Sequence, residues 1–358
     1  MRRTAIGTAA LITAGLLGPA GARAQAAPVD PAAARDVLVA GGISGQVAAR
    51  LTDQLGAART GGVYLDRSSQ RLVVTVTDEA AAETVRAAGG VAEVVAHSAA
   101  ELAAITETLN QSVDLPGGYW GTSPEENQVV VTVPVTVAAA NYATLEQVVA
   151  PFGDAVEIVR GQDPIELQRG AGYYIKTLQG RQCSSGFNVR KKNNPSDKFI
   201  MTAGHCTVGT TSFTEWIYAN NVSIGFTAGG YFPERDWGII DAHAGHSTPG
   251  NVYLHNGDSQ DISHSRDASI NEGVCHSGYV TGYRCGFVRQ FGVTGDFTGG
   301  KVYDLVLTSY CSRKGDSGGP VFSGTAAIGI HVGGSETSCS GLYQRLNPAL
   351  SWYGVEVY

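Results

Sequence analysis

Six cysteines, all in the second half of the chain, constrain its fold more than any other feature of the sequence. The first 182 residues contain none. An even number of cysteines is typical of disulfides formed in an oxidising compartment. Fifteen pairings are possible, and the chain order favours three short loops: Cys183 with Cys206, Cys275 with Cys285, and Cys311 with Cys339. The second half is therefore predicted to be a fold clamped by local crosslinks.

The start of the chain predicts export. Arg2 and Arg3 precede an apolar stretch that runs from about Ala5 to Leu17, and residues 22–24 (ARA) have the small-x-small pattern of a cleavage site. This is the pattern of a secretory signal peptide, predicted over residues 1–24. The apolar run is too short for a membrane span. We therefore expect a secreted, extracellular protein.

Charge divides the chain as unevenly as cysteine does. Residues 25–169 carry 8 basic and 18 acidic side chains, whereas residues 170–358 carry 14 of each. A chain of 358 residues is long enough for two domains. We place their boundary near residue 169. Neither part has a basic patch, so nucleic acid and anionic membranes are not expected partners.

The two parts also differ in their predicted secondary structure. Residues 79–88 and 97–112 have apolar residues near helical spacing, and the β-branched runs at 71–76 and 128–133 read as strands, so the first part is α+β. His97 is expected at a solvated helix start. Beyond Gly170, short strands are broken by Gly, Asn, Ser and Asp, which is typical of an all-β barrel or sandwich.

Three short motifs could together activate a serine. Ser317 lies in the stretch KGDSGGP (314–320). A serine hydroxyl is a poor nucleophile unless a neighbouring base takes its proton and a third group orients that base. His205, in the stretch TAGHC, is the candidate base, and Asp236, just before an apolar strand, is the candidate orienting acid; Asp241, at the other end of that strand, is the alternative. The order His, Asp, Ser is one of the known triad orders.

These motifs resemble those of a known family of enzymes. TAGHC together with GDSGGP resembles the chymotrypsin-type serine peptidases, and FNVR, FPxxD and the closing YGVEVY are similar to the secreted bacterial branch, the streptogrisins and alpha-lytic protease. The strand NQVVV at 127–131 is similar to the propeptides of that branch. The resemblance implies a double six-stranded β-barrel protease domain at 170–358. It also implies that residues 25–169 are a propeptide that assists folding, inhibits the enzyme and is cut away.

The resemblance further assigns roles at the site. It favours Asp236 over Asp241, because the FPxxD pattern ends on the former. Gly315 permits a turn in which the N–H groups of Gly315 and Ser317 form an oxyanion hole. Asp316 is expected to turn inward, with His276 or Arg284 as its partner. The expected product is a secreted serine endopeptidase that is monomeric once mature and needs no cofactor.

Substrate preference is predicted from residues around the expected specificity pocket. In relatives that cleave after glutamate, a histidine occupies the position of His331, where it compensates a buried carboxylate. Ser312 and Lys314 are expected to help, and Gly333 and Gly334 to form the edge that pairs with extended substrate. The alternatives are that His331 faces solvent or the core and the pocket takes a large apolar or a small side chain.

Other classes fit the sequence less well. A catalytically silent, protease-like binding protein should have lost a member of the triad, and an α/β-hydrolase esterase should have a G-x-S-x-G motif with its histidine last. There is no HExxH or cysteine-pair spacing for zinc, so His243, His246, His255 and His264 are expected in solvated loops. Val332 replaces a serine that usually contacts the triad acid in this branch, which predicts a missing hydrogen bond to Asp236.

Overall fold

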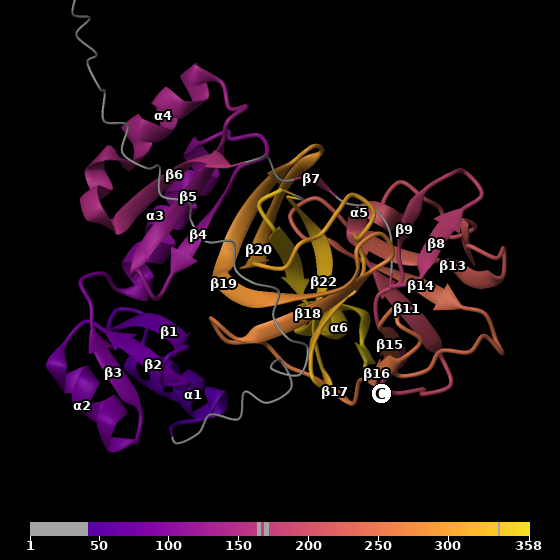
Figure 1. The fold of residues 1–358 in the computed structure, drawn as a ribbon, viewed down its shortest axis with the longest axis horizontal. Helices are drawn as coiled ribbons and strands as arrows, with labels where there is room; N and C mark the ends of the chain where they lie inside the picture. The colour runs from indigo at the N-terminus through magenta and orange to yellow at the C-terminus, as the bar shows by residue number, and fades with distance from the viewer. Residues whose placement is uncertain (1–41, 163–165, 168–171, 336) are drawn as a thin grey trace, which may run out of the picture.

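The computed structural model describes residues 42–162, 166–167, 172–335 and 337–358, which form two small lobes followed by a larger β-rich region (Figure 1). The predicted signal peptide and the predicted start near Gly170 lie outside these residues. No helix among the described residues is long and apolar enough to cross a membrane.

The first lobe, defined here as residues 43–96, is a three-stranded sheet with two helices. Its core combines one face of the sheet with apolar residues of both helices, including Leu51, Val74 and Val85. The predicted helix at 79–88 and strand at 71–76 are present, and the helix over residues 45–55 was not predicted. The elements are α1 (Gly45–Leu55), β1 (Thr60–Asp66), β2 (Arg71–Val76), α2 (Glu79–Ala87) and β3 (Val91–Val94).

The second lobe, residues 97–162, repeats this α+β plan around the buried Trp120. Its first helix begins with a capping box, in which Ser98 and Glu101 each bond the other's backbone N–H. The elements are α3 (Ala99–Ser112), β4 (Tyr119–Ser123), β5 (Gln128–Pro134), α4 (Ala139–Val149), a 3-10 helix (Ala150–Ala155) and β6 (Val156–Gln162). The helix predicted at 97–112 and the strand at 128–133 are thus present, and α4 was not predicted.

The C-terminal region, residues 172–358, consists mainly of two sheets. The first has eight strands in the order β24-β10-β11-β14-β13-β12-β8-β9, because the chain's last strand joins one end. Its strands are β8 (Tyr174–Thr177), β9 (Gln182–Ser184), β10 (Asn188–Lys191), β11 (Lys198–Thr202), β12 (Glu215–Tyr218), β13 (Ser223–Tyr231), β14 (Trp237–Ala242) and β24 (Val355–Glu356). The two helices of the region are α5 (Gly204–Thr207) and α6 (Leu346–Tyr353).

The second sheet of this region closes on itself. Six strands follow in the order β18-β21-β22-β23-β20-β19, and β18 also pairs with β19. The predicted six-stranded barrel is confirmed here, whereas the first sheet has eight strands. The six are β18 (Gly273–Gly278), β19 (Gly282–Phe297), β20 (Gly300–Thr308), β21 (Pro320–Ser323), β22 (Ala326–Ser335) and β23 (Ser340–Arg345). Short strands β15 (Asn251–Tyr253) and β16 (Ser259–Asp261) pair with each other, and β17 (His264–Ser265) pairs with β22.

The second lobe and the second barrel share one continuous sheet. β4 pairs antiparallel with β19, with Thr122 opposite Phe291 and Trp120 opposite Thr294. Both lobes lie on this side of the C-terminal region, away from the first sheet (Figure 1). The backbone of β19 therefore carries hydrogen bonds to the lobe as well as to its own barrel.

All three disulfides join the predicted partners. Cys183 bonds Cys206, Cys275 bonds Cys285, and Cys311 bonds Cys339, over separations of 23, 10 and 28 residues. The first joins β9 to α5, the second joins the paired strands β18 and β19, and the third joins the segments that follow β20 and precede β23. None of the three crosslinks therefore joins the first sheet to the second.

Candidate active site

His205 and Asp236 meet because their strands are neighbours. β11 pairs antiparallel with β14, and Thr202 near the end of β11 lies opposite Gly238 near the start of β14. The chain leaves β11 into α5, which carries His205, and enters β14 directly after Asp236. Gly204 makes this approach possible, because a Cβ atom there would lie 2.1 Å from the carbonyl oxygen of Tyr231.

The carboxylate of Asp236 contacts His205 through both of its oxygen atoms. Oδ1 accepts the backbone N–H of His205 at 2.7 Å, and Oδ2 lies 2.7 Å from the ring Nδ1. Both side chains are almost fully buried, at 4% and 0% exposure. The opposite ring nitrogen, Nε2, is buried and has no hydrogen-bond partner among the described residues. This arrangement fixes the ring orientation and leaves Nε2 available to a nearby proton donor.

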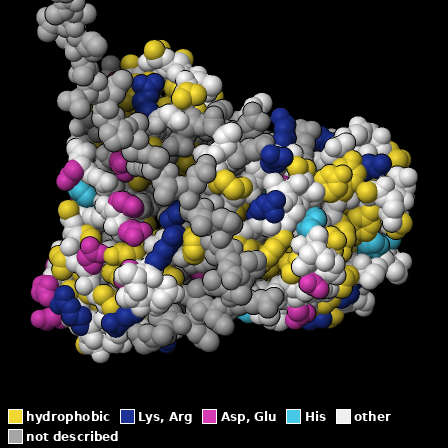
Figure 2. Space-filling model, viewed as in Figure 1, with side chains coloured by type: hydrophobic (Ala, Val, Ile, Leu, Met, Phe, Trp, Pro, Cys, Tyr) yellow, Lys and Arg dark blue, Asp and Glu magenta, His cyan; other side chains and the backbone are white. Residues whose placement is uncertain are grey.

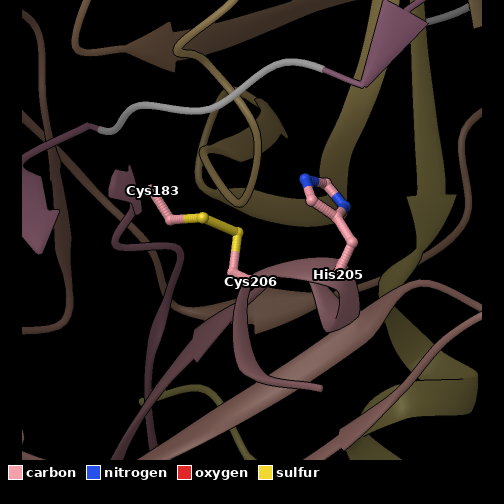
Figure 3. Close-up of side chains that lie close together, drawn as sticks. All are labelled: Cys183, His205 and Cys206. Atoms are coloured by element: carbon pink, nitrogen blue, oxygen red, sulfur yellow. A yellow bond between two sulfur atoms is a disulfide. The ribbon is translucent and has the colours of Figure 1, made fainter. Parts of the chain in front are cut away.

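A disulfide and an arginine hold the short helix that carries His205. Figure 3 shows the ring of His205 beside the Cys183–Cys206 disulfide. Arg181 donates from one guanidinium nitrogen to the carbonyl oxygens of His205 and Cys206, at 3.2 and 3.3 Å. The two sulfur atoms and the imidazole cluster within 4.8 Å, but sulfurs bonded to each other are not thiolate ligands, so this cluster carries no argument for a metal.

Ser317 lies in a glycine-dependent loop that is tied to both sheets. Its carbonyl accepts the N–H of Ser184 at 2.8 Å, and the next residue, Gly318, donates to the carbonyl of His331 at 2.7 Å. Gly315 and Gly318 have φ of 129° and 90°, values that favour glycine. The hydroxyl of Ser317 is buried and donates to the carbonyl of Val332 at 2.8 Å. The structure records no hydrogen bond between this hydroxyl and His205.

Asp316 turns inward and is fully buried, as predicted. Its carboxylate accepts from the N–H of Arg313 and from the hydroxyl of Thr281, at 2.8 and 2.7 Å, and His276 Nε2 lies 3.7 Å away. Burial alone would raise the pKa of Asp316, but the neighbouring His276, with smaller effects from His331 and the N–H of Arg313, outweighs burial and holds the pKa well below its usual range. Of the two predicted partners, His276 lies beside Asp316, whereas Arg284 bonds the carbonyl of Tyr283.

His331 is fully buried, so the alternative in which it faces solvent is wrong. Its Nδ1 lies 2.9 Å from the hydroxyl of Tyr310, and its ring centroid is 4.8 Å from that of His276. Burial and the proximity of His276 hold the pKa of His331 well below its usual range. The imidazole is therefore neutral near pH 7. Ser312 is buried, its Oγ 2.8 Å from where a Cβ on Gly334 would lie, and Lys314 is exposed.

Gly333 and Gly334 pair with an extended segment from the same chain. The segment is β7 (Glu166–Leu167), which runs antiparallel to β22 with Leu167 opposite Gly333 and Glu166 opposite Gly334. This edge was predicted to receive extended substrate. The residues that occupy it lie at the end of the predicted propeptide, a few positions before the predicted start near Gly170.

Sequence reasoning missed the residues that support the site from neighbouring strands. Gln344 of β23 is buried; its Oε1 accepts the N–H of Asp236 at 3.1 Å, and its Nε2 donates to the carbonyls of Tyr303 and Asp304. A polar side chain within the apolar strand GLYQRL was the available signal. Val332, in place of a serine, contributes its carbonyl to Ser317.

The remaining predicted positions are placed away from this cluster. Asp241, the alternative acid, is exposed at the far end of β14. His264 is exposed, and His243, His246 and His255 are partly exposed, each within or beside a loop. His97 is at the start of the second lobe, where its backbone N–H donates to Asn127 and its ring lies 3.5 Å from Asp154.

Known proteins resemble the whole chain. The models "Alpha-lytic protease pro N-terminal" and "Alpha-lytic protease prodomain" match residues 32–95 and 97–151. Serine protease 1 of Streptomyces fradiae is 36% identical over the full length of both chains. Streptogrisin-D of Streptomyces griseus is 35% identical over 88% of this chain and 79% of its own. Glutamyl endopeptidase 2 of Streptomyces griseus is 39% identical over 50% of this chain and 94% of its own.

The chymotrypsin-like barrel, the matched prodomain models and these relatives make the protein a serine-type endopeptidase with an attached prodomain. The chain belongs to the streptogrisin and alpha-lytic protease family. The two lobes are its prodomain, and the C-terminal region is called the protease domain from here on.

Proposed function

We propose that Ser317, His205 and Asp236 form the catalytic triad. The double contact between His205 and Asp236 carries this proposal, because it orients the ring and selects Nδ1 as the nitrogen that holds the proton. Ser317 attacks the scissile carbonyl while Nε2 takes its proton, and Nε2 then returns that proton to the leaving amine. Water hydrolyses the acyl-enzyme by the same route. The hydroxyl must first turn from the carbonyl of Val332 toward the ring.

The N–H groups of Gly315 and Ser317 are the proposed oxyanion hole. The φ of 129° at Gly315 supports this assignment, because such a backbone turns successive N–H groups toward one point. Removal of one donor of this kind typically costs about 3 kcal/mol of activation free energy. Asp316 supports the loop from inside through its bonds to Arg313 and Thr281. It is not given a role in proton transfer.

Extended polypeptides are the proposed substrates, bound by strand addition at Gly333 and Gly334. The pairing of β7 with these two residues supports this mode, since it forms there with an extended segment of the chain itself. β7 also supports the prodomain as an inhibitor that covers the substrate edge. We further propose export after loss of residues 1–24, with maturation near Gly170 that separates residues 25–169 from 170–358.

Glutamate before the scissile bond is the proposed preference. A buried imidazole with Tyr310 at Nδ1 can hold its other nitrogen as an N–H donor, which suits a carboxylate. The 39% identity to Glutamyl endopeptidase 2 supports the same choice. The alternative is a preference for large apolar residues, favoured by the neutral state of the buried His331 and by the adjacent ring of Tyr310.

Two measurements test these assignments. A fluorophosphonate should label the mature enzyme at Ser317 and fail to label the Ser317→Ala variant. Peptides that differ only in Glu, Phe or Ala before the scissile bond should give the highest kcat/KM with Glu, and His331→Ala should remove that preference while the exposed control His264→Ala keeps it. A higher kcat/KM for Phe in the unchanged enzyme would favour the apolar alternative.

A further inference from the structure

Glutamate is unevenly divided between the prodomain and the protease domain. Ten of the fifteen glutamates lie within residues 25–169, and the longer stretch 170–358 has only five. Figure 2 shows that most acidic side chains on the visible face lie over the two lobes. If glutamate is the preferred residue, as proposed above, the prodomain therefore contains most of the bonds that the enzyme would cut. The inference below rests on that preference.

The exposure of these side chains is divided in the same way. Nine of the ten prodomain glutamates are exposed: Glu79, Glu83, Glu93, Glu101, Glu107, Glu125, Glu126, Glu146 and Glu157. The tenth, Glu166, lies in β7, whose backbone is paired with β22. In the protease domain Glu272 is buried against Arg266, and Glu356 pairs with Arg190. Glu234 is exposed, but its φ of 75° and its backbone bonds to Lys301 and Tyr303 hold it out of the extended form that a substrate needs.

Glu93 is the prodomain glutamate best placed for cleavage. It lies in β3, a four-residue strand at the end of the order β1-β2-β3, so one edge of β3 has no partner strand in the described part of the chain. Its backbone is already extended, and the next residue, Val94, is 49% exposed. Five of the other exposed glutamates lie in helices, two in the tight turn after β4, and Glu157 in the longer strand β6.

The position of Glu93 matters because it joins the two lobes. β3 ends at Val94 and α3 begins after its cap at Ser98, and the two prodomain models meet at this point, ending at 95 and starting at 97. Cleavage between Glu93 and Val94 would leave each lobe as a separate chain. Apart from contacts between the lobes, such as the bond from the N–H of Ala100 to the carbonyl of Ala57 at 2.9 Å, each would then be held on the protease domain by its own contacts.

Each lobe has its own contacts with the protease domain. In the first lobe, the N–H of Leu65 donates to the carbonyl of Ile270, and the carbonyl of Leu65 accepts from the side-chain amide of Asn271, both at 2.8 Å. The guanidinium of Arg67 lies over the ring of Phe287, 3.8 Å from its centroid. The second lobe contributes β4, which pairs with β19. Asn271 also bonds Glu125 of the second lobe at 3.0 Å. The prodomain is therefore a bivalent ligand, and cutting the connection between its lobes removes the gain in affinity that comes from linking two binding sites.

We infer that mature enzyme releases the prodomain by hydrolysing the Glu93–Val94 bond in another molecule. Ser317 Oγ adds to the carbonyl carbon of Glu93, and the C–N bond to Val94 breaks as the amine takes a proton from His205. Water then hydrolyses the Glu93 ester and restores the serine. The reaction consumes one water and needs no other reactant. The protease domain is spared because its own glutamates are few and mostly paired or buried.

The experiment uses the full precursor carrying Ser317→Ala as substrate and a trace of mature unchanged enzyme as protease. The first new N-terminus within the prodomain should be Val94-Val95-Ala96. In a precursor that also carries Glu93→Gln this cut should slow by about tenfold or more, because the site would lose its charged partner. The matched control Glu83→Gln removes the same charge from α2 and should cut at the unchanged rate. Glutamine can still accept the bond from Tyr64.

A second readout is the delay before activity appears in active precursors. Glu93→Gln should lengthen the delay and leave the final kcat/KM unchanged, since residue 93 is absent from the mature enzyme. First cuts elsewhere, such as after Glu157, or an unchanged delay in Glu93→Gln, would overturn the inference while leaving glutamate preference intact. A failure of the proposed function would look different: peptides with Phe would be cut best, and no prodomain cut would follow a glutamate.

Discussion

At the scale of single residues, the proposed triad could be predicted because each member lies in its own short motif. His205, Asp236 and Ser317 are each followed or preceded by residues that fix their local backbone, and the sequence order is one of the known ones. Gln344 and Tyr310 could not be predicted in the same way. Their contacts with Asp236 and His331 depend on the register of β23 and on the end of β20, which pattern alone does not set.

The buried His331 should make stability fall in mild acid. Its folded pKa lies well below its usual range, and the unfolded value is about 6.5. Below that pH the unfolded chain binds a proton that the folded chain does not, so the free energy of unfolding decreases as pH falls. The titratable groups around it are Tyr310, His276, Asp316 and His205.

The measurement is the thermal midpoint of the Ser317→Ala precursor, which cannot digest itself, between pH 7.5 and 5. Adding His331→Gln should reduce the loss of stability over this interval. The exposed His264 provides the control, because His264→Gln should leave the slope as it was. An equal slope with and without His331 would show that other groups cause the acid sensitivity.

At the scale of elements, the predicted helices and strands of the prodomain were right where caps and β-branched runs were strong. α3 has its capping box, and β2 is almost entirely β-branched or leucine. α4 was not predicted, and it lacks a side-chain cap and contains several residues of weak helix propensity. It forms because Leu145 is buried in the core of the second lobe, a tertiary contact that local pattern does not reveal.

Lys301, in the hairpin of β19 and β20, should contribute much of the affinity of this hairpin for the prodomain. Lys301 Nζ donates to the carbonyls of Asn110 and Val113, at 3.1 and 2.7 Å, near the C-terminal end of α3. A cation at this end of a helix is favourable, and hydrogen bonds of charged groups contribute about 1.5–3 kcal/mol. Lys301→Met should therefore raise the inhibition constant of the prodomain by roughly 10- to 100-fold.

The inhibition constant can be measured with the released prodomain and a peptide substrate. Lys192→Met is the matched control, because Lys192 is exposed in the first sheet region and should leave inhibition unchanged. kcat/KM without prodomain should be the same in both variants. Equal inhibition of the Lys301→Met enzyme and the unchanged enzyme would place the binding energy elsewhere in the interface.

At the scale of the whole molecule, the protease domain depends on contacts between distant parts of the chain. β10 pairs with β24, and Arg190 bonds Glu356 across 166 residues. Pairing of this kind requires long loops to close before contacts form, which slows folding. The prodomain offers β4 as a preformed neighbour for β19, so it can stabilise part of the second barrel early.

We expect the protease domain alone, residues 170–358, to refold with low yield, and addition of residues 25–169 as a separate chain to restore activity. Recovered peptidase activity after dilution from denaturant, with disulfides kept intact, measures the yield. The control is an unrelated folded protein at the same concentration. Equal recovery with and without the prodomain would contradict a role in folding.

When the second lobe departs, the edge of β19 that had paired with β4 becomes exposed. The backbone groups between Phe291 and Gly295 that had bonded β4 would then face water. An exposed edge strand can pair with strands of other molecules and cause aggregation. Irregular register along this stretch, and Gly292 with φ of 61°, interrupt the flat surface that such attachment needs. The irregular strand β19 thus pairs with β4 of the prodomain but is poorly suited to pairing with strands of other molecules. This favours solubility of the enzyme after the prodomain has left.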